Sequence, residues 1–134
     1  MIALLLGAVT VTGAWSRPAI DTGVVYATLH DNGPRAVALV GASTPIARSA
    51  ELHESTPTAG GSMQGMAMPA MAMHPVARLV VPPHGTAVLR PGGYHLMLLG
   101  LRRPLAPGTR FPLVLRFADG TVVRVSVPVE NRAF

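Results

Sequence analysis

The chain has 134 residues, enough for one domain with its own core, and it contains 14 Gly, 13 Pro and no Cys. Without Cys, disulfides, thiolate-bound zinc, iron–sulfur clusters, a Cys nucleophile and the blue-copper electron-transfer site are excluded. The 11 basic residues are all Arg, against 6 acidic residues, and they form no basic stripe, so we expect no nucleic-acid binding.

The first fourteen residues have the pattern of a secretory signal. An apolar run at 2–11 precedes Thr12, Gly13 and Ala14, small residues of the kind read by a signal peptidase, and Trp15 would begin the mature chain. No Lys or Arg precedes the run, so two alternatives stay open: the start lies further upstream, or the segment is an N-terminal strand. We predict a signal peptide, complete or not, at 1–14 and a single domain at 15–134.

The first strand of that domain is predicted at 23–30, which is enriched in β-branched and aromatic residues. A turn signal follows at 31–34 (DNGP), so we expect 35–41 to return as the second strand of a hairpin.

A further strand is predicted at 47–54 (ARSAELHE). Alternation along it places Glu51 and His53 on one face, and Leu52 on the other, towards the core.

The segment 55–73 differs in composition from everything around it. It is uncharged, and its Gly and Pro residues argue against a helix, so we expect a loop that leads into a strand at its end. Methionine usually fills gaps in cores, but a Gly-rich loop has no core face; an adaptable apolar surface without metal stays an alternative. The segment contains five of the seven Met residues: Met63, Met66, Met68, Met71 and Met73.

The second half of the chain reads as short strands between turn signals. A final hairpin turns at 118–120 (ADG), and its last strand alternates apolar and mixed residues, which is typical of a sheet with one buried face. With those of the first half, this gives about eight strands, enough for two packed sheets. The strands expected here are 76–81, 86–89, 94–101, 111–117 and 121–128.

The strand at 94–101 carries the most informative pair of residues. His95 and Met97, two apart, would present an imidazole and a thioether on one face. Two such donors suit Cu(I), although an isolated pair is more often an ordinary strand histidine and a core methionine.

Several longer stretches resemble the periplasmic copper chaperone family PCu(A)C. They are AWSRPAIDTGVVYATLHDNG at 14–33, ELHE around His53, VVPPHGTAVLRPGGYHLMLLGL at 80–101 and LVLRFADG at 113–120. The family signature is H-x10-M-x21-H-x-M, and here 21 residues separate Met73 from His95, with His95 and Met97 as the H-x-M. The resemblance covers nearly all of 15–130 and implies an all-β, cupredoxin-like Greek-key β-sandwich.

One departure from the signature lies between the first two ligands. Residues 54–72 number nineteen where the family has ten, a nine-residue, Met-rich insertion. Either Met73 is the ligand and the loop bulges, or another methionine such as Met63, Met66 or Met71 takes or shares the position. We prefer Met73, because its downstream spacing matches and a longer loop costs little entropy.

The resemblance implies a Cu(I) site formed by His53, Met73, His95 and Met97. Glu51 and Glu54 would orient His53 by accepting a hydrogen bond. Further donors could come from the inserted segment and its neighbour: Met63, Met66, Met68, Met71 and His74.

The implied function is that of an exported, bacterial, periplasmic copper(I) chaperone, monomeric and not an enzyme. It would pass Cu(I) to an acceptor, either the dinuclear copper centre of cytochrome c oxidase subunit II or another copper chaperone, and would meet the membrane only through that partner. Two alternatives stay open, copper sequestration by the Met-rich loop and a metal-free secreted interaction domain.

Overall fold

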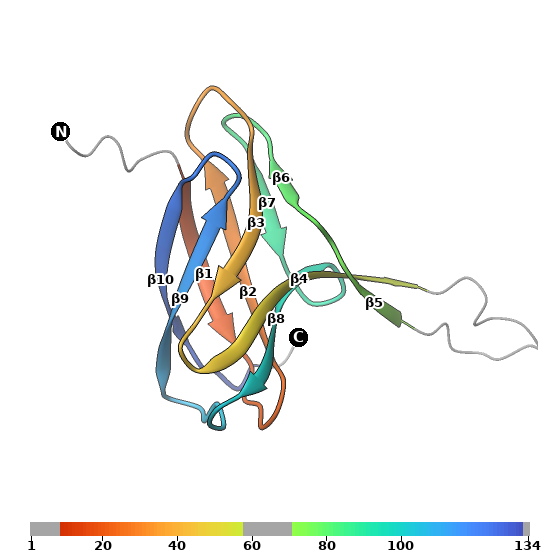
Figure 1. The fold of residues 1–134 in the computed structure, drawn as a ribbon, viewed down its shortest axis with the longest axis vertical. Helices are drawn as coiled ribbons and strands as arrows, with labels where there is room; N and C mark the ends of the chain where they lie inside the picture. Colours follow the sequence, from red (N-terminus) through yellow and green to blue (C-terminus); the bar gives the residue numbers. More distant parts are fainter. Residues whose placement is uncertain (1–8, 58–70, 133–134) are drawn as a thin grey trace, which may run out of the picture.

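Ten strands form the folded part of the chain in the computed structural model, which describes residues 9–57 and 71–132 (Figure 1). No helix lies within these ranges, and so none of the described residues forms a helix that could span a membrane. In chain order the strands are β1 (Val9–Ser16), β2 (Gly23–Asp31), β3 (Val37–Ser43), β4 (Ala47–Pro57), β5 (Met71–Pro75), β6 (Leu79–Val81), β7 (Thr86–Leu89), β8 (Tyr94–Leu101), β9 (Arg110–Phe117) and β10 (Val122–Pro128).

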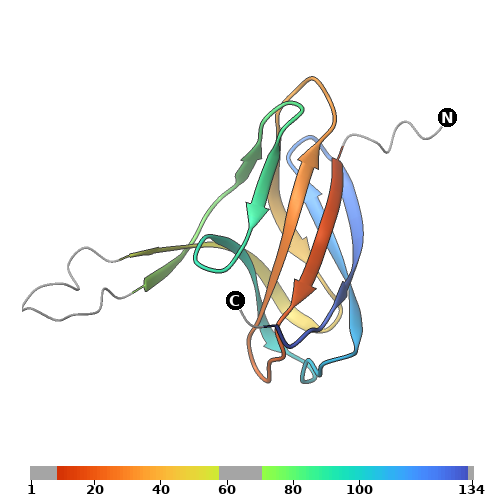
Figure 2. The ribbon, with the colours of Figure 1, turned by 180° about the vertical axis from the view of Figure 1, so that it is seen from behind.

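The strands belong to one sheet that folds over on itself. Its order is β1-β2-β7-β8-β4-β3-β9-β10, with β5 on β4, β6 on β3 and a direct pairing of β2 with β8. A bridge joins Ser16 at the end of β1 to Val129, the residue that follows β10, so the sheet is nearly closed (Figures 1 and 2). The predicted all-β sandwich is confirmed, with ten strands among the described residues rather than about eight.

The N-terminal strand includes part of the segment that resembles a signal. Residues 9–12 pair with 28–31 of β2, and the side chain of Val9 is buried in the core. Residues 9–14 therefore belong to the folded sheet in this structure, as the alternative of an N-terminal strand requires.

The hairpin expected from 23–30 and 35–41 is wrong. β2 pairs with β1, β7 and β8, whereas β3 pairs with β4, β6 and β9. The DNGP turn does reverse the chain, since the Asp31 side chain accepts a hydrogen bond from Gly33 N at 2.9 Å. However, the connection at 32–36 is long enough to carry β3 across to the other side of the folded sheet, where it lies between β4 and β9.

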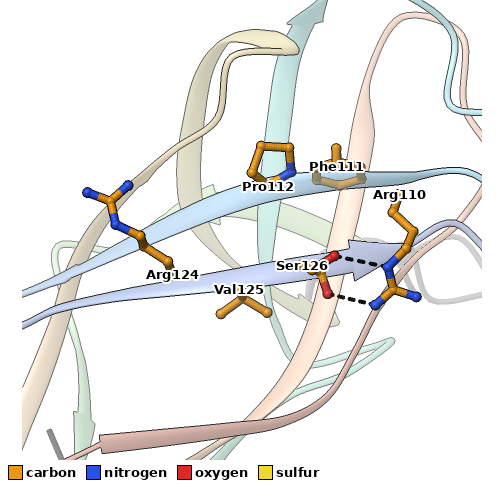
Figure 3. Close-up of a pocket in the computed structure, with 6 residues that line it drawn as sticks. All are labelled: Arg110, Phe111, Pro112, Arg124, Val125 and Ser126. Atoms are coloured by element: carbon orange, nitrogen blue, oxygen red, sulfur yellow. Dashed lines mark hydrogen bonds between the residues drawn. The ribbon is translucent and has the colours of Figure 1, made fainter.

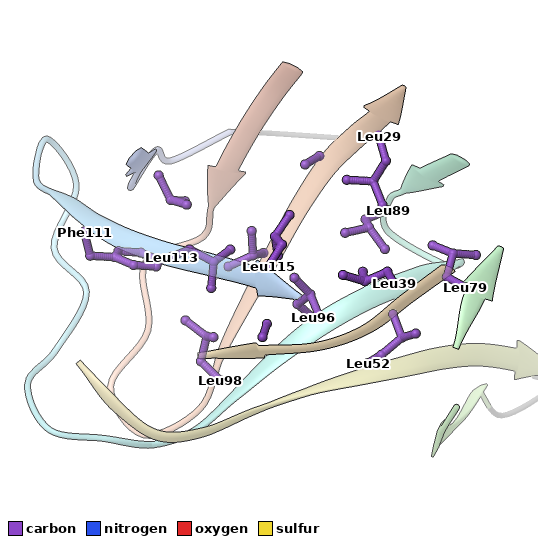
Figure 4. Close-up of a cluster of buried hydrophobic side chains, with 14 of the residues drawn as sticks. Leu29, Leu39, Leu52, Leu79, Leu89, Leu96, Leu98, Phe111, Leu113 and Leu115 are labelled. Atoms are coloured by element: carbon purple, nitrogen blue, oxygen red, sulfur yellow. The ribbon is translucent and has the colours of Figure 1, made fainter. Parts of the chain in front are cut away.

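The core fills the space that the folded sheet encloses (Figure 4). Alternate residues of β8 point into it, with Leu96 1% and Leu98 0% exposed, and they pack with leucines of β9 such as Leu113 and Leu115. Burying each such side chain stabilises the fold by about 1.5 to 3 kcal/mol. Because side chains alternate along a strand, the intervening residues of β8, His95 and Met97, lie on the outer face of the sheet.

Candidate metal site

Two histidines from different strands face each other on this outer surface. β4 runs antiparallel to β8 in a register that places His53 directly opposite His95. Their ring centroids are 6.0 Å apart, at an interplanar angle of 43°. Residues distant in sequence thus present two imidazoles side by side.

His95 is the more buried of the two, only 2% exposed, and its tautomer is set by the backbone. Its Nδ1–H donates to the carbonyl oxygen of Gly93 at 3.0 Å, which leaves the lone pair on Nε2. That Nε2 atom is buried and has no hydrogen-bond partner among the described residues.

A tight turn presents the Gly93 carbonyl. Gly93 N donates to the Arg90 carbonyl at 3.0 Å, and Gly92 within the turn has φ +79°, a left-handed conformation that favours glycine. The PGG sequence before Tyr94 therefore serves to position His95.

Burial lowers the pKa of His95 because it disfavours the charged imidazolium. The hydrogen bond to Gly93 opposes this shift, and the nearby His53 adds to it. His95 is accordingly neutral at neutral pH, as metal ligation requires.

His53 is held by a carboxylate on its own strand. Its Nε2–H donates to Glu51 Oε1 at 2.9 Å, while its Nδ1 is buried without a hydrogen-bond partner among the described residues. An unsatisfied buried polar atom costs about 1 to 3 kcal/mol, and here two occur on facing rings. Such a pair of unpartnered lone pairs is suited to a shared metal ion.

The methionine of the H-x-M lies next to this pair. Met97 is partly buried, opposite Glu51 on β4 and Val24 on β2. The backbone of Met73 pairs with Ser55, two residues beyond His53 on β4, and that of Met71 pairs with Pro57. Met63, Met66 and Met68 fall outside the described residues.

His74 and Glu54 form a separate pair. They are opposite each other across β5 and β4, with His74 Nε2 and Glu54 Oε1 3.7 Å apart. Glu54 is adjacent to His53 in the strand and so lies on the other face. The structure therefore brings Glu51 to His53, and places Glu54 and His74 together elsewhere.

A cavity of about 180 Å³ adjoins His95, and sequence reasoning missed it. Besides His95 it is lined by Arg17, Val24, Tyr26, Ser55, Pro91 and Gly92. The only signal for it in the sequence is the alternation of β2, which puts Val24 and Tyr26 on one face.

A second hollow, of about 360 Å³, lies on β9 and β10 (Figure 3). It contains no His or Met, and Arg110 in it donates to Ser126 Oγ at 2.9 Å. Its lining offers no soft metal ligand.

The donor set at the histidine pair suits a soft ion. Among the described residues no group of three or more His, Asp or Glu side chains could hold a metal, so further ligands at this site would be thioethers such as Met97. Imidazole and thioether favour Cu(I), whereas Mg²⁺ and Ca²⁺ prefer oxygen.

The fold and the site together define a class: a single-domain β-sandwich with soft ligand groups on one outer face. Residues 9–129 match the model of the family described as "Putative lipoprotein LpqE-like", and the chain belongs to that family. A relative from Leifsonia xyli subsp. xyli (strain CTCB07), "Putative lipoprotein Lxx21020", is 32% identical over 125 residues, covering 92% of this chain and 70% of the relative.

Solved structures show the same fold. The apo PCuAC domain from PmoF1 superposes with a TM-score of 0.73 at 22% identity, covering 94% of this chain and 96% of that domain. Apo-DR1885 from Deinococcus radiodurans is 33% identical, with a TM-score of 0.63 and coverage of 93% and 80%. The Cu(I) form of DR1885 superposes with a TM-score of 0.64 at 29% identity, covering 96% of this chain and 84% of that protein. The expected cupredoxin-like fold is confirmed.

Proposed function

We propose that this protein is an exported carrier of Cu(I), which it binds with His53, His95, Met97 and Met73. The observation that carries the proposal is the neighbouring pair of imidazoles, each with one buried nitrogen that has no hydrogen-bond partner among the described residues. Met97 adds a thioether on the same face, and the related DR1885 has been solved in a Cu(I) form.

The protein's own residues prepare the site for a soft ion. The Gly93 carbonyl and the Glu51 carboxylate each hold a proton on the far nitrogen of one ring, which keeps the other nitrogen free to donate. No thiol is used, so the site can function in an oxidising compartment. Neutral imidazole and thioether ligands also allow release to an acceptor with thiolates.

The proposed role is delivery to a copper-accepting protein, for which the dinuclear centre of cytochrome c oxidase subunit II or another copper chaperone is suitable. We propose a monomer without enzymatic activity. Export agrees with two findings, since the description of the family and the name of the Leifsonia relative both contain the word lipoprotein. The proposal includes a signal segment at the N-terminus. Where that segment ends depends on whether the mature chain keeps strand β1.

An anaerobic titration with Cu(I) against a competing chelator tests the proposal. We expect one equivalent bound per chain, and a loss of affinity of at least roughly tenfold in His95→Ala and in Met97→Ala. His30→Ala is the matched control, because the His30 ring is hydrogen-bonded to Thr12 on β1. This variant should bind Cu(I) with the affinity of the wild type. Failure of the wild type to bind Cu(I), or equal affinity in His95→Ala, would contradict the proposal.

A further inference from the structure

The cavity beside His95 combines a positive charge with hydroxyl groups. Among the residues that the structure describes, the lining has one charged side chain, Arg17, and no carboxylate, and Ser55 and Tyr26 also line it. The Tyr26 ring packs against Trp15 with centroids 5.2 Å apart. Burial raises the pKa of Tyr26, with the charge of Arg17 acting in the opposite direction, so its hydroxyl is neutral and can donate.

This lining is suited to an anion. Arg17 is exposed, so its guanidinium acts as a solvent-screened positive charge that attracts an anion towards the cavity, and hydroxyl donors in the lining add to the attraction. His95 shares the cavity, and its buried Nε2 has no partner among the described residues. Because His95 is one of the proposed Cu(I) ligands, an anionic group in the cavity would lie against a residue that holds the metal.

The anion that best fits a position beside Cu(I) is a thiolate, because soft ions prefer sulfur. We infer that this cavity receives the thiolate of a copper acceptor, and that the Arg17 guanidinium stabilises this thiolate as it enters. The inference rests on the proposed function, and it adds an entry point for the acceptor and a residue that controls transfer.

The exchange balances without electron transfer. The acceptor thiol gives its proton to solvent, its sulfur forms a bond to copper, and the bond between copper and His95 Nε2 breaks, while the metal stays Cu(I). A neighbouring arginine lowers the pKa of a thiol, so Arg17 would increase the fraction present as thiolate. Arg17 should thus govern the transfer rate more than the affinity of the resting site.

Transfer rates to two acceptors test this role on the full chain loaded with Cu(I). Glutathione provides a thiolate, and neocuproine is an uncharged nitrogen chelator. We expect Arg17→Gln to slow transfer to glutathione roughly tenfold, the effect of a one-unit change in thiol pKa on the thiolate fraction, and to leave transfer to neocuproine unchanged. Tyr26→Phe, which keeps the ring, should slow the glutathione reaction by a smaller factor.

The matched control is Arg124→Gln, which makes the same charge change in the hollow on β9 and β10, at a residue that does not line the cavity. It should behave like the wild type with both acceptors. Equal glutathione rates in wild type and Arg17→Gln, or equal slowing with both acceptors, would overturn the inference.

A measurement without copper separates this inference from the proposed function. Thiocyanate added to the apoprotein at constant ionic strength should shift the NMR signals of His95 saturably in the wild type and Arg124→Gln, and not in Arg17→Gln. If the wild type took up no Cu(I), the proposed function would fail, and this titration would still decide the anion site. No shift in the wild type, or an equal shift in Arg17→Gln, would overturn it.

Discussion

His95 connects the chemistry of the site to the stability of the fold. Its pKa is lowered in the folded protein from the ordinary value of 6.5, chiefly by burial. Below that pH the unfolded chain takes up a proton that the folded protein resists, so the free energy of unfolding must fall as pH falls. Above it, both states carry neutral imidazole and this contribution to stability is complete.

We therefore expect the apoprotein to lose stability as pH falls from about 6.5 towards 5, with no change from this group above 6.5. Denaturant unfolding at a series of pH values measures this, and His95→Gln, which lacks the titrating group, supplies the reference. A difference between the two proteins that stays constant across the range would count against burial of a neutral His95.

Glu51 and Glu54 offer a matched comparison on one strand. Glu51 accepts a hydrogen bond from the His53 ring, whereas Glu54 is paired with His74 on the other face. Losing a carboxylate that orients a ligand typically costs 10- to 100-fold in metal affinity. We expect about that loss of Cu(I) affinity in Glu51→Ala and wild-type affinity in Glu54→Ala, measured by chelator competition; the same affinity in both variants would argue against orientation by Glu51.

At the residue scale, the sequence could predict which residues share a face. The two-residue alternation that separates His95 and Met97 from Leu96 and Leu98 is local, and the structure follows it. The pairing of His53 with His95 depends on the register of two strands far apart in sequence, which no local pattern encodes. For the same reason, the sequence could not predict that Arg17 and Tyr26 line a cavity beside His95.

At the scale of elements, strand β1 bears on where the mature chain begins. Its residues 9–12 pair with β2, and the rings of Trp15 and Tyr26 pack at a tilt across the same two strands. A chain that begins at Trp15 would lose four residue pairs and the buried side chain of Val9.

We expect deletion of residues 1–14 to lower the free energy of unfolding by about 2 kcal/mol or more, from lost burial and hydrogen bonds. Deletion of residues 1–8, which leaves β1 intact, is the control and should have a much smaller effect. Thermal unfolding of the two shortened chains measures the difference. Equal melting temperatures would mean that β1 contributes little, and would favour a mature chain that begins at Trp15.

The two turn signals show how far local sequence determines an element. The ADG turn does close the hairpin of β9 and β10, where Phe117 N donates to the Thr121 carbonyl at 2.9 Å and Thr121 N to Asp119 Oδ1 at 2.9 Å. The DNGP turn reverses the chain equally well, but its flanking strands join different layers. A turn fixes the change of direction, whereas the choice of partner strand depends on the whole core.

For the whole molecule, the all-β class could be predicted because Gly and Pro interrupt every apolar run before a helix could form. The strand order could not, since β4 lies between β8 and β3 by long-range packing. This strand order brings His53, His95 and Met97 to one outer face, together with the cavity beside His95. The backbone of Met73 reaches the same strand, β4, through its pairing with Ser55.

The central claim, a Cu(I) site made of two imidazoles and two thioethers, is tested most directly by X-ray absorption on the copper-loaded protein. We expect two nitrogen and two sulfur neighbours around Cu(I), from His53, His95, Met97 and Met73, and one sulfur fewer in Met73→Ala. Three or more sulfur neighbours would bring in the inserted methionines, and an unchanged sulfur count in Met73→Ala would assign the position to one of them. A copper ion with no sulfur neighbour would contradict the account.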